Sequence, residues 1–157
     1  MNVNGRPYQT VWLEGSTVKL IEQRKLPHVF EVVACVTYQE TARAIQEMVV
    51  RGAGAIGAAA GYAMAQAALH APEARFHDAL DEAAEAIRAT RPTAHDLFYA
   101  VDRVRAADSC ANSVESARMA AVRAATALAE DNARACQAMG RAGLPLMTPG
   151  LRMLSTG

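Results

Sequence analysis

A glycine-rich segment between two helical patterns constrains the fold of this chain more than any other feature. Residues 52–57 read Gly-Ala-Gly-Ala-Ile-Gly, and the pattern before them starts at Thr37 with a capping box and continues with apolar residues on one helical face. We therefore expect one helix to lead into the glycines and another to follow them. The first turn of a helix has backbone N–H groups without internal partners, and glycine lets an anion approach them closely.

Arg51 stands directly before these glycines and adds a permanently charged group that can bind a phosphate through two hydrogen bonds. Two or three charge-assisted hydrogen bonds, worth roughly 1.5–3 kcal/mol each, would hold a sugar phosphate. The segment therefore predicts an anion site. A structural alternative stays open here, because the small residues Gly52, Gly54, Gly57 and Gly61 would also let two helices pack closely.

The same glycines match the spacing of the dinucleotide-binding fingerprint, which is a further functional alternative. That fingerprint needs a strand before its first glycine and an acidic residue about 20 positions later. Here a helix is expected before Gly52, and Glu73 follows Pro72 as in the first turn of another helix. This context argues against a nicotinamide or flavin cofactor, and we expect no cofactor.

Elsewhere the chain changes from strand patterns to helical patterns near residue 37. Strands are predicted at 10–13, 17–21 and 29–36, and helices at 38–50, 54–69, 73–89, 94–107 and 113–139. The expected fold is α+β and mostly α, with a small N-terminal antiparallel sheet followed by a bundle of about five helices. We expect a small β subdomain over residues 1–36, the bundle over 37–144, and the start of a linker or strand over 145–157.

Composition and charge limit the partners. Sixteen basic and sixteen acidic residues give no net charge, which argues against nucleic acid as a main partner. The apolar run at 53–69 is mostly alanine and glycine, so a buried helix is expected in place of a membrane span, and the polar start of the chain predicts a cytoplasmic protein. Cys35, Cys110 and Cys136 lack the spacing of a disulfide framework or a metal site, so no metal is expected.

Several ordered motifs carry a family resemblance from about residue 10 to about residue 150. Residues 51–57 resemble the Arg-Gly-Ala-Pro-Ala-Ile-Gly signature of 5-methylthioribose-1-phosphate isomerases and their relatives, the ribose-1,5-bisphosphate isomerases and the regulatory subunits of translation initiation factor 2B. Further segments similar to that family are residues 22–27, 90–93, 97–100 with Arg103, and 130–132 with Gly140. The methylthioribose branch fits best, because it carries both the Arg-Gly-Ala loop and the Thr-Arg-Pro-Thr segment. Gly54 replaces the family's proline, which we expect to loosen the loop.

The resemblance implies a role in binding a sugar-phosphate substrate. It places Arg51, Gly52 and Ala53 on the family's substrate-binding loop, and Arg91 on a second arginine that contacts the substrate. Pro92 restricts Arg91 to an extended backbone, which can direct its side chain away from the helices on either side. A helix cap or a surface ion pair is the alternative for Arg91.

The resemblance also identifies groups that these 157 residues lack. The family's catalytic cysteine lies in a Thr-His-Cys-Asn-x-Gly segment that would fall near residues 151–157, and its catalytic aspartate lies in a Rossmann-like second domain. We therefore assign no catalytic residue and expect the N-terminal, phosphate-binding half of an aldose–ketose isomerase of methionine salvage, inactive alone. The alternative is a non-catalytic regulatory or interaction module like the initiation factor 2B subunits.

Apolar residues gather near the end of the chain, at Leu144, Leu146, Met147, Leu151, Met153 and Leu154. Large exposed apolar patches are seldom tolerated in monomers. We therefore expect either a homo-oligomer or a missing C-terminal half that covers this surface.

Overall fold

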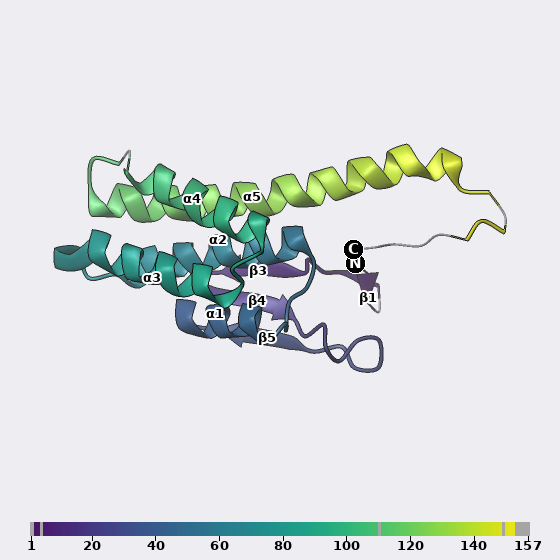
Figure 1. Ribbon diagram of the computed structural model, residues 1–157, viewed down its shortest axis with the longest axis horizontal. Helices are drawn as coiled ribbons and strands as arrows, with labels where there is room; N and C mark the ends of the chain where they lie inside the picture. The colour runs from purple at the N-terminus through teal and green to yellow at the C-terminus, as the bar shows by residue number, and fades with distance from the viewer. Residues whose placement is uncertain (1, 4, 110, 149, 153–157) are drawn as a thin grey trace.

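Helix α2 lies at the centre of the molecule and contacts the sheet and each of the other four helices (Figure 1). The computed structural model describes all residues except 1, 4, 110, 149 and 153–157. Its helices are α1 (Tyr38–Gln46), α2 (Ala53–His70), α3 (Phe76–Thr90), α4 (His95–Ser109) and α5 (Val114–Gly143), with short 3-10 turns at Glu73–Arg75 and Leu144–Leu146. The expected α+β class, with a small antiparallel sheet followed by five helices, is confirmed.

The sheet is antiparallel and has the strand order β3-β4-β5. Its strands are β3 (Val11–Glu14), β4 (Thr17–Ile21) and β5 (Val32–Cys35), and a separate pair, β1 (Asn2–Val3) with β2 (Arg6–Pro7), precedes them. Glu14 pairs with Thr17, so the predicted hairpin turns through two residues, and Gly15 takes the positive φ of 62° that this turn needs. The third strand starts at Val32 and not at residue 29, where Val29 is exposed outside the sheet.

Every residue of α2 from residue 56 to residue 68 is buried. The alanines and glycines of this helix let the sheet and the neighbouring helices approach it from several sides. Gln66 is a buried polar exception, and its hydrogen bonds are satisfied: Nε2 donates to the carbonyls of Ser16 (2.9 Å) and Cys35 (2.8 Å), and Oε1 accepts from the Thr41 hydroxyl (2.6 Å). Within the described residues, no helix is long and apolar enough to cross a membrane.

Two helices start at side-chain caps. Thr37 and Glu40 form the expected capping box at α1, and Ser113 with Ser116 forms one at α5. From residue 133 to residue 142 the side chains of α5 are exposed, and this part of the helix projects beyond the bundle (Figure 1). The last helix therefore continues four residues past its predicted end at residue 139 without packing against the bundle.

The end of α1 differs from the prediction. The apolar pattern predicts a helix to residue 50, but α1 ends at Gln46 because Met48 adopts a left-handed backbone with φ of 59°. The N–H of Met48 donates to the Ile45 carbonyl (3.1 Å), and the N–H of Val49 donates to the Ala44 carbonyl (2.9 Å). These two hydrogen bonds form a Schellman motif, which ends the helix and turns the chain toward α2.

Candidate functional site

The candidate site lies where the chain passes from α1 into α2. We use the name connection segment for residues 47–54, which join the end of α1 to the first two residues of α2. Within it, Val49 and Val50 are buried, whereas Arg51, Gly52 and Ala53 are exposed. The buried valines anchor the segment, and the residues expected to bind a ligand face solvent.

Gly52 is the N-cap residue of α2, and its φ of 91° lies in a region that side-chain-bearing residues rarely adopt. Its carbonyl accepts the N–H of Ile56 (2.9 Å), which starts the helix. Among the described residues, no side chain caps this end of α2. The first-turn N–H groups next to Ala53 are therefore not used by a capping side chain, in contrast to those of α1 and α5.

Arg51 contributes a backbone contact and a side chain. Its N–H donates to Oε1 of Gln23 over 2.7 Å. Its guanidinium is on an exposed residue and forms no ion pair with the part of the chain that the structure describes. Arg51 therefore carries an exposed positive charge next to the N-cap residue of α2.

Arg91 is the C-cap residue of α3 and is half-buried, with an extended φ of −149°. Its carbonyl accepts the N–H of Ala94 (3.0 Å) in the turn to α4. Its guanidinium forms no ion pair with another described residue. The surface ion pair that was the alternative role for Arg91 is therefore not found among these residues. The extended backbone agrees with the restriction expected from Pro92.

The order of the helices brings the two arginines to one end of the bundle. α2 and α3 run in opposite directions, as do α3 and α4, so the end of α3 and the starts of α2 and α4 lie at the same end (Figure 1). A Cβ added at Gly57 would lie only 3.0 Å from the Asp96 carbonyl oxygen, which shows how closely the starts of α2 and α4 pack. The close-packing role of the glycines therefore applies at Gly57, while Gly52 serves the backbone turn.

Gly54, like Gly57, lies where α2 packs closely against another helix, as the structural alternative for the glycines expects. It lies inside the first turn of α2, and a Cβ there would lie 2.5 Å from Cγ of Asn132 and still closer to Oδ1. Glycine at this position therefore makes room for a side chain of α5. The sequence does not identify Asn132 as the partner, because residues 78 positions apart (132 minus 54) carry no local signal of their contact.

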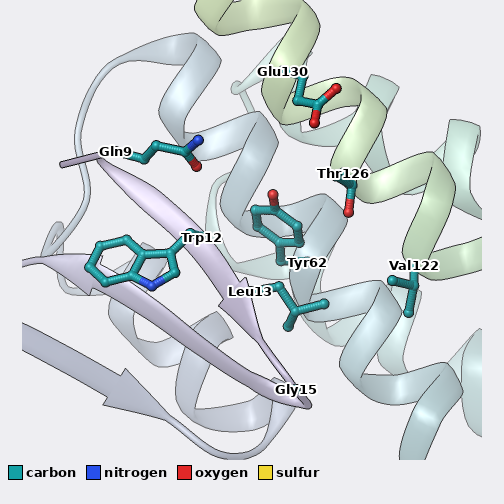
Figure 2. A pocket seen from close by; sticks show the side chains of 8 residues that line it. All are labelled: Gln9, Trp12, Leu13, Gly15, Tyr62, Val122, Thr126 and Glu130. Carbon is teal, nitrogen blue, oxygen red and sulfur yellow. The ribbon is translucent and has the colours of Figure 1, made fainter. Parts of the chain in front are cut away.

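A hollow of about 300 Å³ adjoins this contact and is lined by residues of α2, α4 and α5, among them Gly54, Asp96, Tyr99 and Asn132. A second cavity, of about 370 Å³, lies nearer the start of α5, where Tyr62 faces Thr126 and Glu130 across from Trp12 and Leu13 (Figure 2). Burial raises the pKa of the Tyr62 phenol, so the hydroxyl stays protonated at neutral pH. The lining of this second cavity includes none of the four residues expected to bind substrate.

Side chains that could hold a metal do not gather in the described part of the chain, where no group of three His, Cys, Asp or Glu residues has suitable geometry. Cys35 is buried, and burial raises the pKa of its thiol, which disfavours the reactive thiolate. Cys136 is exposed on α5. The prediction for Cys110 lies outside the described residues.

Residues 49–157 match the Initiation factor 2 subunit family, and the chain belongs to this family. It is similar to methylthioribose-1-phosphate isomerase of Methylocella silvestris, with 43% identity over 155 residues, and to that of Roseiflexus castenholzii, with 43% identity over 154 residues. These matches cover 94% and 90% of this chain but 40% and 43% of the relatives. The chain thus spans about two-fifths of the length of these curated relatives.

Two solved structures share the fold. The 5-methylthioribose 1-phosphate isomerase of Pyrococcus horikoshii matches with a TM-score of 0.74 and 35% identity, over 78% of this chain and 36% of that one. The delta subunit of translation initiation factor eIF-2B from A. fulgidus matches with a TM-score of 0.84 and 35% identity, over 92% of this chain and 43% of that one. The resemblance that the sequence motifs carry is therefore confirmed.

Proposed function

We propose that this chain is the N-terminal, substrate-phosphate-binding half of an aldose–ketose isomerase that converts 5-methylthioribose 1-phosphate to 5-methylthioribulose 1-phosphate in methionine salvage. One observation carries the proposal: the connection segment presents the exposed Arg51 beside an α2 start that no described side chain caps. The curated relatives, which are methylthioribose-1-phosphate isomerases, support this choice of substrate. A cytoplasmic location fits a charged sugar-phosphate substrate.

In this proposal Arg51 and the N–H groups of Gly52 and Ala53 hold the phosphate, and Arg91 contacts the substrate from the turn after α3. An isomerisation of this type moves a proton between adjacent carbons and needs an acid–base group at the reacting carbons. The cysteine and aspartate segments that the family resemblance leads one to expect are not among the 157 residues. The chain alone therefore supplies binding and orientation, and we expect no turnover from it.

The proposed organisation keeps the divisions drawn from the sequence, with the small β subdomain over 1–36, the bundle over 37–144, and the linker start over 145–157. Several exposed apolar side chains lie at the far end, on Met139, Leu144, Leu146, Met147 and Leu151; Met153 and Leu154 lie outside the described residues. We propose that a second copy of the chain or a C-terminal half covers this surface. Light scattering at micromolar concentration distinguishes a dimer from a monomer of 16.7 kDa.

A regulatory or interaction module of the initiation factor 2B type is the second candidate. It is supported by the structural match to the delta subunit, whose TM-score of 0.84 exceeds the 0.74 of the isomerase. Dinucleotide binding is less well supported, because α1 occupies the position where the fingerprint requires a strand.

Thermal unfolding with and without 5-methylthioribose 1-phosphate tests the proposal. A ligand at about 100 times its Kd stabilises the folded state by about 2.7 kcal/mol, which raises the Tm. We expect this rise in the wild type and in Arg43→Ala, which removes another exposed arginine, but not in Arg51→Ala. NAD should have no effect.

Two results would contradict the proposal. Stabilisation by NAD but not by the sugar phosphate would favour dinucleotide binding, and no stabilisation by either would favour the regulatory module. Ketose formation at about 1 per second or faster, as in typical enzymes, would refute the expected inactivity of the chain alone.

A further inference from the structure

The turn after β4, residues 22–24, lies against the connection segment and contacts it at several points. The backbone N–H of Gln23 donates to the carbonyl of Val49 over 2.9 Å. The side chain of the same residue accepts the N–H of Arg51 over 2.7 Å. Gln23 therefore holds the chain on both sides of Val50, whose side chain is fully buried.

The connection segment needs such support, because Met48 has a strained backbone conformation and Gly52 has one that only glycine adopts readily. Met48 has φ of 59°, which costs a side-chain-bearing residue roughly 1–2 kcal/mol, and Gly52 has φ of 91°. Conformations of this kind persist only where the surrounding structure determines them. The hydrogen bond from Arg51 to Gln23 lies between these two positions and fixes the direction in which the chain enters α2.

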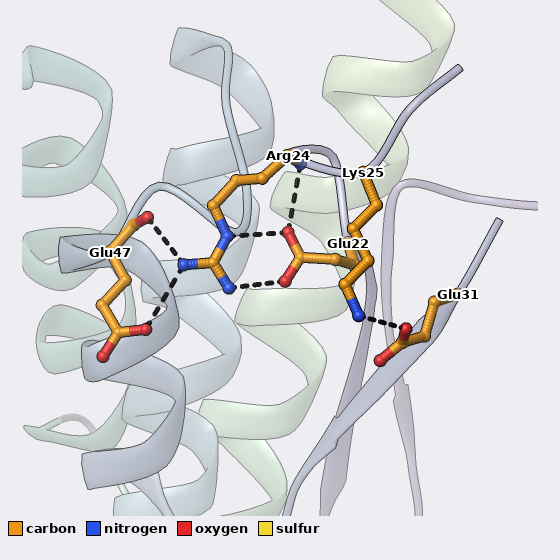
Figure 3. Close-up of polar contacts among 5 residues, drawn as sticks. All are labelled: Glu22, Arg24, Lys25, Glu31 and Glu47. Carbon is orange, nitrogen blue, oxygen red and sulfur yellow. Dashed lines mark hydrogen bonds and ion pairs between the residues drawn. The ribbon is translucent and has the colours of Figure 1, made fainter. Parts of the chain in front are cut away.

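The turn itself is held by an ion pair (Figure 3). Glu22 is only 3% exposed, and its carboxylate accepts two hydrogen bonds from the Arg24 guanidinium, from Nε at 2.9 Å and from Nη2 at 2.6 Å. The other terminal nitrogen, Nη1, lies 3.4 Å from both the carbonyl and the carboxylate of Glu47. Arg24 thus ties the buried carboxylate to the first residue of the connection segment.

Glu22, Gln23 and Arg24 belong to the turn after β4, and within the described part of the chain Gln23 is the one of the three whose side chain forms a hydrogen bond with Arg51. The hydrogen bonds between Glu22 and Arg24 hold the turn in place, and Gln23 lies between these two residues. The Gln23 side chain then holds the backbone of Arg51 through its hydrogen bond. A polar side chain whose oxygen meets a backbone N–H at 2.7 Å is well placed to set the orientation of the residue that follows.

We propose that Gln23 is a positioning residue for the phosphate site, acting through the backbone of Arg51 and supported by the Glu22–Arg24–Glu47 contacts. The proposal rests on the function proposed above for the same site. Gln23 does not contact the phosphate. It holds Arg51 and the start of α2 in the geometry that binds the phosphate, so its loss raises the Kd for the ligand more than it affects the rest of the fold.

Hydrogen exchange and ligand binding, measured on the whole 157-residue chain, test this role. Gln23→Leu removes the acceptor with little change in size, and we expect the Arg51 amide to exchange roughly tenfold faster and the Kd for 5-methylthioribose 1-phosphate to rise roughly tenfold, as for the loss of one well-placed hydrogen bond. Amides in the centre of α2 should keep their exchange rates. The matched control is Gln39→Leu, at an exposed position of α1, which should change neither quantity.

Gln23→Glu separates positioning from a general effect of substitution. Its carboxylate keeps an acceptor for the Arg51 N–H, so the slow exchange of that amide should be preserved. Its negative charge opposes a phosphate, so exchange and not affinity is the readout for this variant.

An unchanged exchange rate of the Arg51 amide in Gln23→Leu would overturn the positioning role. Faster exchange with an unchanged Kd would overturn its effect on binding. If the wild type binds no sugar phosphate, the proposed function fails, and faster exchange in Gln23→Leu would still show that Gln23 orders the connection segment.

Discussion

The connection segment and the last part of α5, residues 133–142, are both largely exposed, yet they are fixed to different degrees. The connection segment has two buried valines, a Schellman motif, and hydrogen bonds to Gln23 and Arg24. Residues 133–142 form a regular helix whose side chains are exposed all around. Exposure alone therefore does not show how firmly a segment is held: buried valines and hydrogen bonds to Gln23 and Arg24 fix the connection segment, while Arg51, Gly52 and Ala53 remain exposed.

The largest expected difference between the two regions concerns buried apolar atoms. Val50 is 0% exposed in the connection segment, and Val50→Ala removes two buried methyl groups at about 0.8 kcal/mol each and leaves a cavity. We expect the free energy of unfolding to fall by about 2–3 kcal/mol. Met139→Ala, at a position 65% exposed within residues 133–142, should change it by less than about 0.5 kcal/mol. Urea unfolding of both variants measures this, and equal losses would contradict the comparison.

The next effect is a dependence of stability on pH through Glu22. The Arg24 guanidinium lowers the pKa of Glu22 below the ordinary value of 4.5, so the folded state favours the ionised form. The resulting stabilisation is fully present above pH 4.5 and is lost as the pH falls through the lower pKa of the folded state. We expect Glu22→Gln to lose about 1–2 kcal/mol at pH 7, a value reduced by the partial exposure of Arg24.

The pH dependence of the difference between the wild type and Glu22→Gln provides the check. Other carboxylates titrate in both proteins, so their contributions cancel in this difference. The difference should shrink steadily as the pH is lowered from 4.5. A difference that stays constant to pH 2 would show that the ion pair does not stabilise the turn.

Local signals predicted some parts of this structure well, and the reasons are physical. The cap at Thr37 depends on a residue three positions away, so the sequence displays it directly. The end of α1 was predicted wrongly because Met48 continues the apolar face of the helix, and the glycine that usually marks a left-handed cap is absent.

The residues of the candidate site also differ in whether the sequence alone could identify them. Arg51 could be selected from the glycines that follow it, and the family resemblance marks both Arg51 and Arg91 as residues expected to contact the substrate. Their role in binding stays a prediction. The contributions of Gln23 and Asn132 could not be predicted, because each depends on a contact between distant segments that leaves no periodic pattern.

The smallest expected effect has opposite signs in the two regions. Gly54→Ala places a Cβ against Asn132 and forces that short side chain into another rotamer, so we expect a loss of about 1 kcal/mol. Gly140→Ala, in the exposed part of α5 where no atom lies within 4 Å of the added Cβ, should gain up to about 1 kcal/mol from helix propensity. Thermal unfolding compares the two. Removing Asn132 as well, in Gly54→Ala/Asn132→Ala, should restore most of the loss, and a double variant as unstable as Gly54→Ala would exclude the contact as its cause.

The central claim is that the start of α2 binds a sugar phosphate, and backbone amide NMR during a titration with 5-methylthioribose 1-phosphate tests it most directly. We predict saturable shifts of the Gly52 and Ala53 amides, with smaller ones near Arg91, and none in Arg51→Ala. Signals from the Tyr62 cavity, such as the Trp12 indole, should not move. Shifts confined to the Tyr62 cavity, or no shifts at millimolar ligand, would contradict the account.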